Sequence, residues 1–406
     1  MKHQPPIKIL YIDHTAQLGG GELALLNLIQ HLDRERFEPQ VLLFSDGPLA
    51  DALRKENIPV HLAMLDPAVN KTTRHAAGRG RSLRLGIIFT TTAFIMKLRR
   101  EISRIKPDIV HTNSLKADLL GGIAARAVGV KLIWHIRDRI ETDYLPKKVA
   151  VVFRKSAKHL PHMVIANSHS TLATLKLPKS KPSAVVYSGM SDPHPDQSSA
   201  APAEAPAGCG GKVIMVGRIS PWKGQDVFIR AAAIVHKSRP DVRFEIVGSA
   251  LFGEDAYEAQ IYQLVKSLGL QEIVSFLGFR KDIPELIAAA DLLVHASTSP
   301  EPFGQVVVQA MAAGKPVVAT RGGGVLETVA ENETGLLVPM GDADAMAAAI
   351  LKVLADPAKA AAMGTAGHRR YLEKFTIEQT ATAVQNLYTR IAKSKGKKKA
   401  PASNGT

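Results

Sequence analysis

The alternation of short apolar runs with longer helical stretches constrains the fold of this chain more than any other feature. The runs recur in two series along the 406 residues. The first series comprises residues 7–13, 39–44, 108–113, 131–137, 162–168 and 183–189. The second comprises residues 212–218, 242–248, 273–278, 292–297 and 316–320. Strands that alternate with helices predict parallel sheets of βαβ units, so we expect an α/β fold with two doubly wound, Rossmann-like domains.

A change of composition separates the two series. Residues 191–211 are rich in Pro, Ala, Ser and Gly, and such a stretch buries too little apolar surface to build a core. We therefore expect an N-terminal domain over residues 1–190, a linker over 191–211 and a C-terminal domain over 212–375. Residues 376–393 are expected to form a last helix, and the lysine-rich residues 394–406 a disordered basic tail.

Cysteine usage and hydropathy favour a protein that works in a reducing compartment. Cys209 is the only cysteine, so the sequence offers neither an intrachain disulfide nor a cysteine-based metal cluster. Residues 1–13 lack the pattern of a signal peptide, and no apolar run reaches the roughly 18–20 residues needed to span a bilayer. We expect a cytoplasmic protein, attached at most peripherally to the inner face of the membrane.

The positive charge of the chain is concentrated in its first half. Residues 1–190 contain 29 Lys and Arg against 15 Asp and Glu, a net charge of +14. Residues 191–392 contain 18 against 22, a net charge of −4. The first half is therefore expected to face an anionic partner, either a membrane surface, a phosphorylated acceptor or nucleic acid. Ordinary solvated lysines are the alternative interpretation.

The stretch EPFGQVVVQAMAAGKPVV, residues 301–318, combines a carboxylate, a tight turn and the start of a helix. The first N–H groups of a helix lack partners within it and carry the positive end of its dipole, so the stretch predicts an anion site after Gly304. Glu301 repels an anion. We expect it instead to accept hydrogen bonds from hydroxyl groups attached to that anion, as in a sugar. A glutamate that only stabilises the helix N-terminus is the alternative.

Arg218 and Lys223 follow the first strand of the second series. Ligands of doubly wound domains bind at the carboxyl ends of the strands, which is also where residues 301–318 are expected. An arginine fork and a lysine point charge at this edge suit two phosphate groups. The combination favours a pyrophosphate held by the two cations and by helix N–H groups.

Three glycines, at positions 19–21, lie between the first strand and the helix that follows it. Glycines there let the backbone approach a ligand or the opposite domain closely. The spacing contains no clean G-x-G-x-x-G, and no acidic residue ends a following strand, so a dinucleotide-binding fingerprint is not supported. A simple tight turn is the other interpretation.

Taken together, these motifs resemble the donor half of the retaining glycosyltransferases of family 4, which have the two-domain GT-B fold. The segments that carry the resemblance are GRISPWKG (217–224), EPFGQVVVQAMAAGKPVVAT (301–320) and NETGLLVPMGDADAMAAAI (332–350). Counterparts in the first half are LGGGE (18–22), WHIRD (134–138) and VIANSHST (164–171). The resemblance implies transfer of a sugar from a UDP-, GDP- or ADP-sugar to an acceptor hydroxyl, with retention. It also implies a glycan or lipid-linked acceptor in lipopolysaccharide, capsule or other cell-surface glycan synthesis.

The resemblance implies catalytic roles for four residues. Arg218 and Lys223 match the cations that grip the donor diphosphate and stabilise the leaving nucleotide. Glu301 matches a glutamate that contacts hydroxyls of the donor sugar. His135 matches a strand-end histidine that reaches the sugar near the reacting centre, although the residue alone is equally compatible with a buried histidine that only supports its strand.

Further donor contacts are implied at two turns. The residues concerned are Gly20, Gly21, Phe303, Gly304, Gln305 and Val306. The two glycines match an acceptor-domain loop that closes over the phosphates, and the backbone amides after Phe303 match a turn that meets phosphate and sugar. One position departs from the family pattern, because Gln309 replaces the glutamate that usually holds the ribose hydroxyls. An amide can accept from one hydroxyl and donate to another, so we expect nucleotide binding to be retained with a neutral, weaker contact.

The expected chemistry uses no metal ion. The single Asp-x-Asp, Asp342 and Asp344, lies at the start of a helix, where Asp342 is expected to be the N-cap. No second carboxylate forms a hydrolase-like pair with Glu301, so double displacement is not supported. The resemblance implies instead a same-face route in which the donor phosphate helps to deprotonate the acceptor hydroxyl.

Other interpretations of the sequence remain open. A sugar-nucleotide epimerase with the GT-B fold would use the same donor. A basic nucleic-acid-binding protein would explain the charge, but aromatic residues are only 5% of the chain and no recognition module is found, so we expect no nucleic-acid partner. Residues 83–106 fit either an amphipathic membrane-surface element or a helix packed on its sheet. His111 and Asn113 either line the acceptor side of the cleft or cap their strand.

Overall fold

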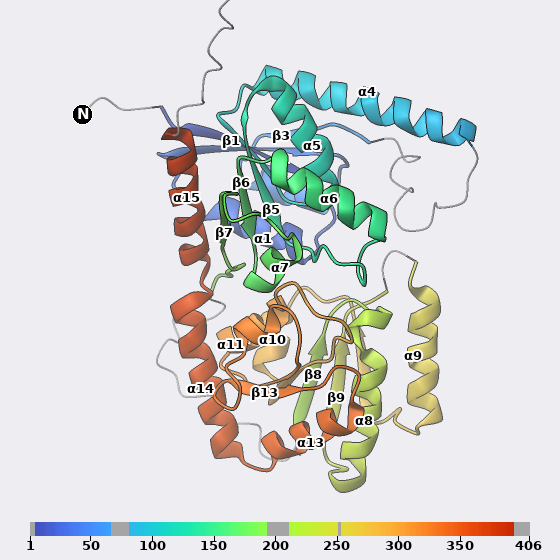
Figure 1. The fold of residues 1–406 in the computed structure, drawn as a ribbon. Coiled ribbons are helices and arrows are strands. Elements are labelled where there is room, and N and C mark those ends of the chain that lie inside the picture. The colour runs from blue at the N-terminus through green and yellow to red at the C-terminus, as the bar shows by residue number, and fades with distance from the viewer. Residues whose placement is uncertain (1–4, 66–80, 193–210, 251–252, 394–406) are drawn as a thin grey trace, which may run out of the picture.

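The computed structural model describes residues 5–65, 81–192, 211–250 and 253–393, with no side-chain detail for residues 81–88. The described residues form two α/β domains, one above the other in Figure 1. Each domain has its own parallel sheet with helices packed against it, so the expected fold class is confirmed. Almost the whole of the expected linker lies outside the described residues.

The N-terminal domain is built on a seven-stranded sheet with the order β3-β2-β1-β4-β5-β6-β7. Its strands are β1 (Ile7–Asp13), β2 (Phe37–Leu43), β3 (Val60–Leu62), β4 (Ile109–Thr112), β5 (Lys131–Ile136), β6 (Met163–Ala166) and β7 (Ser183–Val185). Its helices are α1 (Gly20–Gln30), α2 (Pro48–Lys55), α4 (Arg81–Ile105), α5 (Leu115–Val128), α6 (Lys147–His159) and α7 (His169–Thr174). All neighbouring strands pair in parallel.

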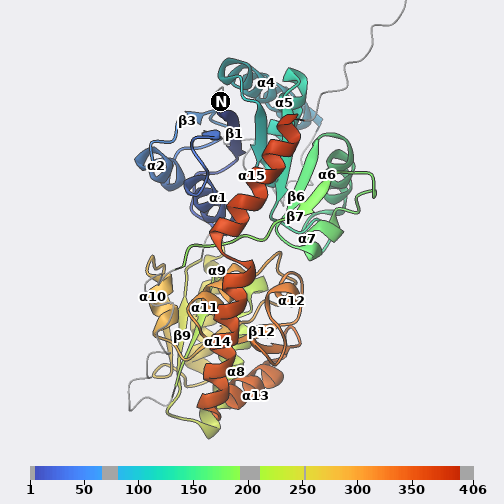
Figure 2. The same cartoon turned by 90° about the vertical axis from the view of Figure 1, so that its left-hand side faces the viewer.

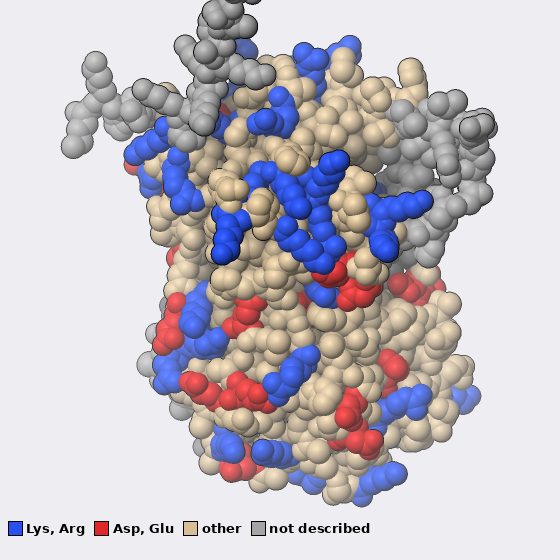
Figure 3. Space-filling model, in the orientation of Figure 1, with Lys and Arg blue, Asp and Glu red and all other residues tan. Residues whose placement is uncertain are grey.

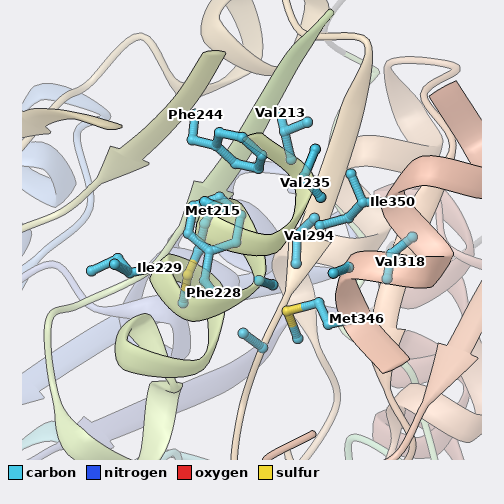
Figure 4. Packing of buried hydrophobic residues seen from close by; sticks show 14 of the residues in the cluster. Val213, Met215, Phe228, Ile229, Val235, Phe244, Val294, Val318, Met346 and Ile350 are labelled. Atoms are coloured by element: carbon cyan, nitrogen blue, oxygen red, sulfur yellow. The ribbon is translucent and has the colours of Figure 1, made fainter. Parts of the chain in front are cut away.

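The C-terminal domain contains a six-stranded parallel sheet with the order β10-β9-β8-β11-β12-β13. Its strands are β8 (Lys212–Val216), β9 (Arg243–Val247), β10 (Val274–Gly278), β11 (Leu292–His295), β12 (Val317–Thr320) and β13 (Gly335–Val338). Its helical segments are η2 (Pro221–Lys223), α8 (Gln225–Ser238), α9 (Asp255–Ser267), α10 (Ile283–Ala288), α11 (Gln305–Ala312), α12 (Val325–Thr328), α13 (Ala343–Leu354) and α14 (Pro357–Lys374). Figure 4 shows the core between this sheet and its helices, where Phe228 and Met346 meet β-branched residues of the strands.

The last helix, α15 (Ile377–Lys393), returns to the first domain, as Figure 2 shows. Its apolar side chains belong to the same buried cluster as residues of β1 and β2. The α15 members of this cluster are Ala381, Val384, Leu387, Tyr388 and Ile391. The N-terminal domain is therefore completed by the final segment of the described chain.

Most of the expected strands were readable because buried parallel strands are almost continuously apolar. Each expected run overlaps a strand of the structure. The sequence analysis missed β3, whose three residues are partly exposed, and β13, a four-residue strand that begins at Gly335. The expected N-cap is confirmed, since the Asp342 side chain accepts a hydrogen bond from the Ala345 N–H at 2.8 Å.

Part of helix α4 agrees with one of the two interpretations of residues 83–106, a helix packed on its sheet. Phe94, Leu98, Ile102 and Ile105 are buried in the core of the N-terminal domain, so this end of the helix packs on its sheet. Phe89, by contrast, is 76% exposed. Among the described residues no helix is both long and apolar enough to cross a membrane.

The docking of α15 predicts a measurable contribution to stability. Leu387→Ala should lower the free energy of unfolding by about 2–5 kcal/mol, because it leaves a cavity in the core that α15 shares with the first domain. Urea unfolding followed by circular dichroism measures the change. Leu372→Ala is the matched control, since Leu372 lies on α14 and is 43% exposed. Equal destabilisation in the two variants would contradict this account of the packing.

Candidate functional site

The part-buried Lys223 and the buried Glu301 form the centre of the candidate site. The Lys223 Nζ lies 2.5 Å from the Glu301 Oε1, although 78 positions separate the two residues in sequence. The same carboxylate oxygen accepts a hydrogen bond from the Ser297 hydroxyl at 2.8 Å and lies 3.4 Å from the His295 Nε2. The Lys223 ammonium also lies 4.3 Å from the centre of the Trp222 ring. The structure thus brings together two residues that sequence analysis assigned separate tasks.

The surroundings of Glu301 keep its carboxyl group ionised. Burial by itself raises the pKa of this carboxyl, because a charge is poorly solvated inside a protein. Lys223 and His295 outweigh that effect, so the pKa of Glu301 lies well below its usual range. The carboxylate is therefore a strong hydrogen-bond acceptor at neutral pH.

Two glycines allow the loops that carry this pair to approach each other. Gly224 follows Lys223 with a φ of +74°, and a Cβ there would lie 2.1 Å from the carbonyl oxygen of Ala296. Gly304 follows the EPF turn with a φ of +87° and caps α11. Both conformations are in the left-handed region that favours glycine. These residues let the end of β8 and the loop after β11 meet at the carboxyl edge of the sheet.

Arg218 follows the end of β8 by two residues. Its backbone carbonyl accepts a hydrogen bond of 2.9 Å from the Gln225 side chain at the start of α8. Gln225 is fully buried, so the loop from Arg218 to Lys223 is fixed at both ends. The arginine side chain itself is half-buried.

The start of α11 lies against the glycine loop of the other domain. A Cβ placed on Gly20 would be 2.3 Å from the Gln305 Oε1, so the two residues are in close contact. Gln305 and Val306 provide the first N–H groups of α11, which have no acceptor within their own helix. The structure thus brings the two turns predicted to bind the donor together across the domain boundary.

His135 lies at the end of β5 and is 1% exposed. Its Nδ1 lies 3.2 Å from the Nε2 of His111 and 3.4 Å from a guanidinium nitrogen of Arg137. Burial, and then the charge of Arg137, lowers the pKa of His135 well below its usual value, so the ring is neutral. His111 is equally buried, and it contacts side chains rather than capping its strand.

A hydrogen-bonded network that sequence analysis missed supports Arg137. The Arg137 Nε donates to the Asn113 side chain at 2.7 Å, and Nη1 donates to the Ser188 hydroxyl at 2.8 Å. Asn113 in turn donates to the buried Asp13 carboxylate at 2.7 Å. Asp13 and Asn113 each stand at the end of a strand, and this position was the only signal in the sequence that pointed to them.

The EPFG turn is also held by the N-terminal domain. The carbonyl oxygen of Pro302 accepts hydrogen bonds from the Ser168 hydroxyl at 2.6 Å and the Thr171 hydroxyl at 3.1 Å. Nearby, the Glu327 carboxylate accepts from the backbone N–H groups of His169 and Ser170, each at 2.8 Å. Side chains and backbone from both domains therefore fix the turn that precedes α11.

The exposure of the side chain decides how a ligand could be contacted at Phe303, Val306 and Gln309. The Phe303 ring is 2% exposed and packs between Tyr187 and Phe375, so a donor contact at this position has to come from its backbone. Val306 and Gln309 are half-buried on α11.

Within the described residues no group of three or more His, Cys, Asp or Glu side chains is arranged to hold a metal ion.

The geometry suits an anion with a polyhydroxylated group attached. Cations at the end of β8 and the N–H groups of α11 provide positive charge, and the Glu301 carboxylate provides an acceptor. Comparison with family models agrees with this chemistry. The model of the glycosyl transferases group 1 matches residues 203–370, and that of glycosyltransferase family 4 matches residues 18–191.

The chain belongs to the group 1 glycosyl transferases. It is 31% identical over 287 residues to the lipopolysaccharide core biosynthesis mannosyltransferase LpsB of Rhizobium meliloti, covering 63% of this chain and 78% of the relative. It is 35% identical over 180 residues to the D-inositol 3-phosphate glycosyltransferase of Corynebacterium aurimucosum, covering 43% of this chain and 42% of that relative. The latter match is thus confined to less than half of each protein.

Solved structures place the fold among the GT-B glycosyltransferases. The crystal structure of Alr3699/HepE from Anabaena in complex with UDP-glucose superposes with a TM-score of 0.78. It is 29% identical in sequence and covers 95% of this chain and 100% of HepE. Glycosyltransferase activity therefore follows from the family.

The depressed pKa of Glu301 predicts how stability depends on pH. An unfolded glutamate titrates near pH 4.3, so as the pH falls from about 5 to 3 the unfolded state binds a proton that the folded state does not, and stability is lost. In Glu301→Gln this loss is absent. The unfolding free energy of the variant should therefore fall less steeply over that range than that of the wild type. The two slopes should differ by up to about 1.4 kcal/mol per pH unit.

Chemical denaturation at a series of pH values measures these slopes. Glu333→Gln serves as the matched control, because the Glu333 side chain is 59% exposed and pairs with Arg369 only at the surface. The control is expected to keep the wild-type slope. Parallel curves for wild type and Glu301→Gln would show that the carboxylate does not titrate as described.

Proposed function

We propose that this protein transfers a sugar from a nucleoside-diphosphate sugar to an acceptor hydroxyl, with retention at the anomeric carbon, as a family 4 enzyme. The observation that carries this proposal is the position of the Lys223–Glu301 pair beside the N-terminus of α11, opposite the glycine loop. Positive charge and a carboxylate acceptor stand side by side there. A sugar joined to a diphosphate needs this combination.

In this proposal the two ends of the donor are bound by different groups. Arg218, Lys223 and the first N–H groups of α11 bind the diphosphate. Glu301 accepts hydrogen bonds from sugar hydroxyls, and the Lys223 ammonium is shared between the carboxylate and the nearer phosphate. His135 contacts the sugar from the N-terminal domain.

The principal catalytic contribution is electrostatic. Negative charge grows on the diphosphate as the bond between sugar and phosphate breaks, and cations and helix N–H groups already aimed at that charge lower the barrier without reorganisation. The acceptor hydroxyl attacks from the same face and gives its proton to the departing phosphate oxygen. This route needs no metal ion and no carboxylate nucleophile.

The relatives suggest the kind of donor and acceptor. HepE binds UDP-glucose, and LpsB is a mannosyltransferase of lipopolysaccharide core biosynthesis. We infer a UDP-, GDP- or ADP-hexose as donor and a glycan or lipid-linked acceptor of the cell surface. Gln309 is proposed to contact the ribose through its amide, with a weaker bond than a carboxylate would make.

Substitution of the central pair is expected to abolish transfer. Lys223→Ala and Glu301→Ala should each lower the rate of sugar transfer by about 100-fold or more, the usual effect of removing a preorganised group that stabilises the transition state. Calorimetry against UDP-, GDP- and ADP-sugars identifies the donor, and product analysis with and without acceptor separates transfer from epimerisation. Lys266→Ala, at an exposed position on α9, is the control. Wild-type turnover in a folded Lys223→Ala or Glu301→Ala variant would overturn the site assignment.

We also propose that the N-terminal domain rests on an anionic membrane surface. Lysine and arginine side chains gather on this domain in Figure 3, whereas the other domain mixes both signs. Lys148, Val151, Val152 and Lys155 of α6 are exposed and spaced to share one helix face, while Phe153 faces the core. Cations beside exposed valines suit a surface of acidic lipid headgroups and acyl chains.

Vesicle sedimentation tests the membrane proposal. The protein should bind phosphatidylglycerol vesicles more tightly than phosphatidylcholine vesicles, and Lys148→Gln and Lys155→Gln should each weaken binding about fivefold, since a lysine near such a surface contributes about 1 kcal/mol. Lys237→Gln in the C-terminal domain is the control. Equal binding to both kinds of vesicle, or an equal loss in the control, would refute a role for this face.

A further inference from the structure

Glu327 of the C-terminal domain caps the first turn of α7 in the other domain. Its Oε2 accepts a hydrogen bond from the His169 N–H at 2.8 Å, and its Oε1 accepts one from the Ser170 N–H at 2.8 Å. The Tyr187 hydroxyl also donates to Oε2, at 3.2 Å. The first N–H groups of a helix have no acceptor within it, and here the other domain provides one. Figure 1 shows α7 at the lower edge of the N-terminal domain, beside the C-terminal domain.

Helix α12 connects this carboxylate firmly to the candidate site. The helix begins beside Glu301, since the Gly324 N–H donates to the Glu301 carbonyl at 2.8 Å. The end of the helix is held by α14, where Arg370 donates to the backbone carbonyls of Glu327 and Thr328, each at 2.7 Å. The backbone of α12 is therefore fixed within the C-terminal domain without help from the Glu327 side chain.

The carboxylate of Glu327 acts between domains, because its three donors all belong to the N-terminal domain. The contact is accessible to solvent, since Glu327 and Ser170 are half-buried and His169 is exposed. When the contact opens, water can therefore replace either partner, which a buried polar group would not allow. A contact of this kind suits two domains that are held together reversibly.

We propose that Glu327 is a positioning residue that keeps the N-terminal domain docked against the EPFG turn, in the arrangement that brings Gly20 beside Gln305. The Ser168 and Thr171 hydroxyls, which donate to this turn, belong to the same end of α7 as the two capped N–H groups. Loss of the carboxylate therefore lowers the fraction of molecules in which the two turns predicted to bind the donor face each other. The consequence for the donor rests on the function proposed above, whereas the docking contact does not.

Spin-label distances test the docking without any substrate. In a Cys209→Ser background, labels on Lys55→Cys of α2 and Lys266→Cys of α9, both at exposed positions, report the separation of the two domains by double electron–electron resonance. The wild type at Glu327 should give one narrow distance distribution. Glu327→Ala should add a second population, and a saturating concentration of the UDP-, GDP- or ADP-sugar that the protein uses should restore the wild-type distance.

Steady-state kinetics test the consequence for the donor. When only a fraction of the protein is competent to bind, the apparent dissociation constant rises in proportion to the inverse of that fraction. Glu327→Ala removes charge-assisted hydrogen bonds, so KM for the donor should rise about tenfold while kcat stays within about twofold of the wild type. A partly unfolded enzyme would instead lose kcat at constant KM, and this difference separates positioning from a structural defect.

Three further variants serve as controls. Glu331→Ala removes a carboxylate from the same segment that pairs with Arg321 of its own domain, and should leave the distance and KM unchanged. Tyr187→Phe removes one of the three donors but keeps the ring that stacks on Phe303, so KM should rise about two- to threefold. Glu327→Gln keeps one acceptor oxygen and should lie between the wild type and Glu327→Ala.

The outcomes distinguish the two proposals. An unchanged distance distribution in Glu327→Ala would overturn the docking role whatever the activity. A shifted distribution with unchanged KM, or with a loss of kcat alone, would overturn the positioning role, while transfer by the wild type would still support the proposed function. A wild type that neither binds nor uses any of the nucleotide sugars would refute the proposed function, and the distance measurement would still decide the docking.

Discussion

The buried contact between Lys223 and Glu301 is the interaction on which the rest of the site depends. A carboxylate withdrawn from water is stable only beside a cation and hydrogen-bond donors. Lys223 provides the cation and the Ser297 hydroxyl donates a hydrogen bond, while the His295 Nε2 lies 3.4 Å away. The pair can form only when the two loops that carry it lie close together. Gly224 allows this, because its backbone lies against the backbone that follows β11. Helix α11 begins at Gln305, four residues after Glu301, so its first N–H groups follow the carboxylate closely along the chain.

The sequence indicated where the candidate site residues lie on the fold better than which residues they contact. Strands that are buried on both faces are continuously apolar, so their ends were recognisable, and Arg218 and His135 stood out as polar residues at those ends. The pairing of Lys223 with Glu301 was not readable, since 78 residues separate them and their contact depends on how two loops pack.

The two domains contribute unequally to the site, yet neither completes it alone. Most of the charged groups stand on the C-terminal domain, while the turn that presents them is held by Ser168 and Thr171 of the other. Gly20 provides the close approach that lets Gln305 reach across the boundary. Movement of one domain against the other would therefore alter the position of the EPFG turn as well as the distance between the two halves.

The return of α15 to the first domain has a consequence for biosynthesis. Domains usually fold as units while the chain emerges from the ribosome, with the N-terminal one first. Here a buried layer against the first sheet consists of residues near position 388, which are translated after the whole second domain. Until α15 has been synthesised, the apolar surface around Tyr11 and Phe37 lacks its cover, so the first domain becomes complete only after the second has been translated.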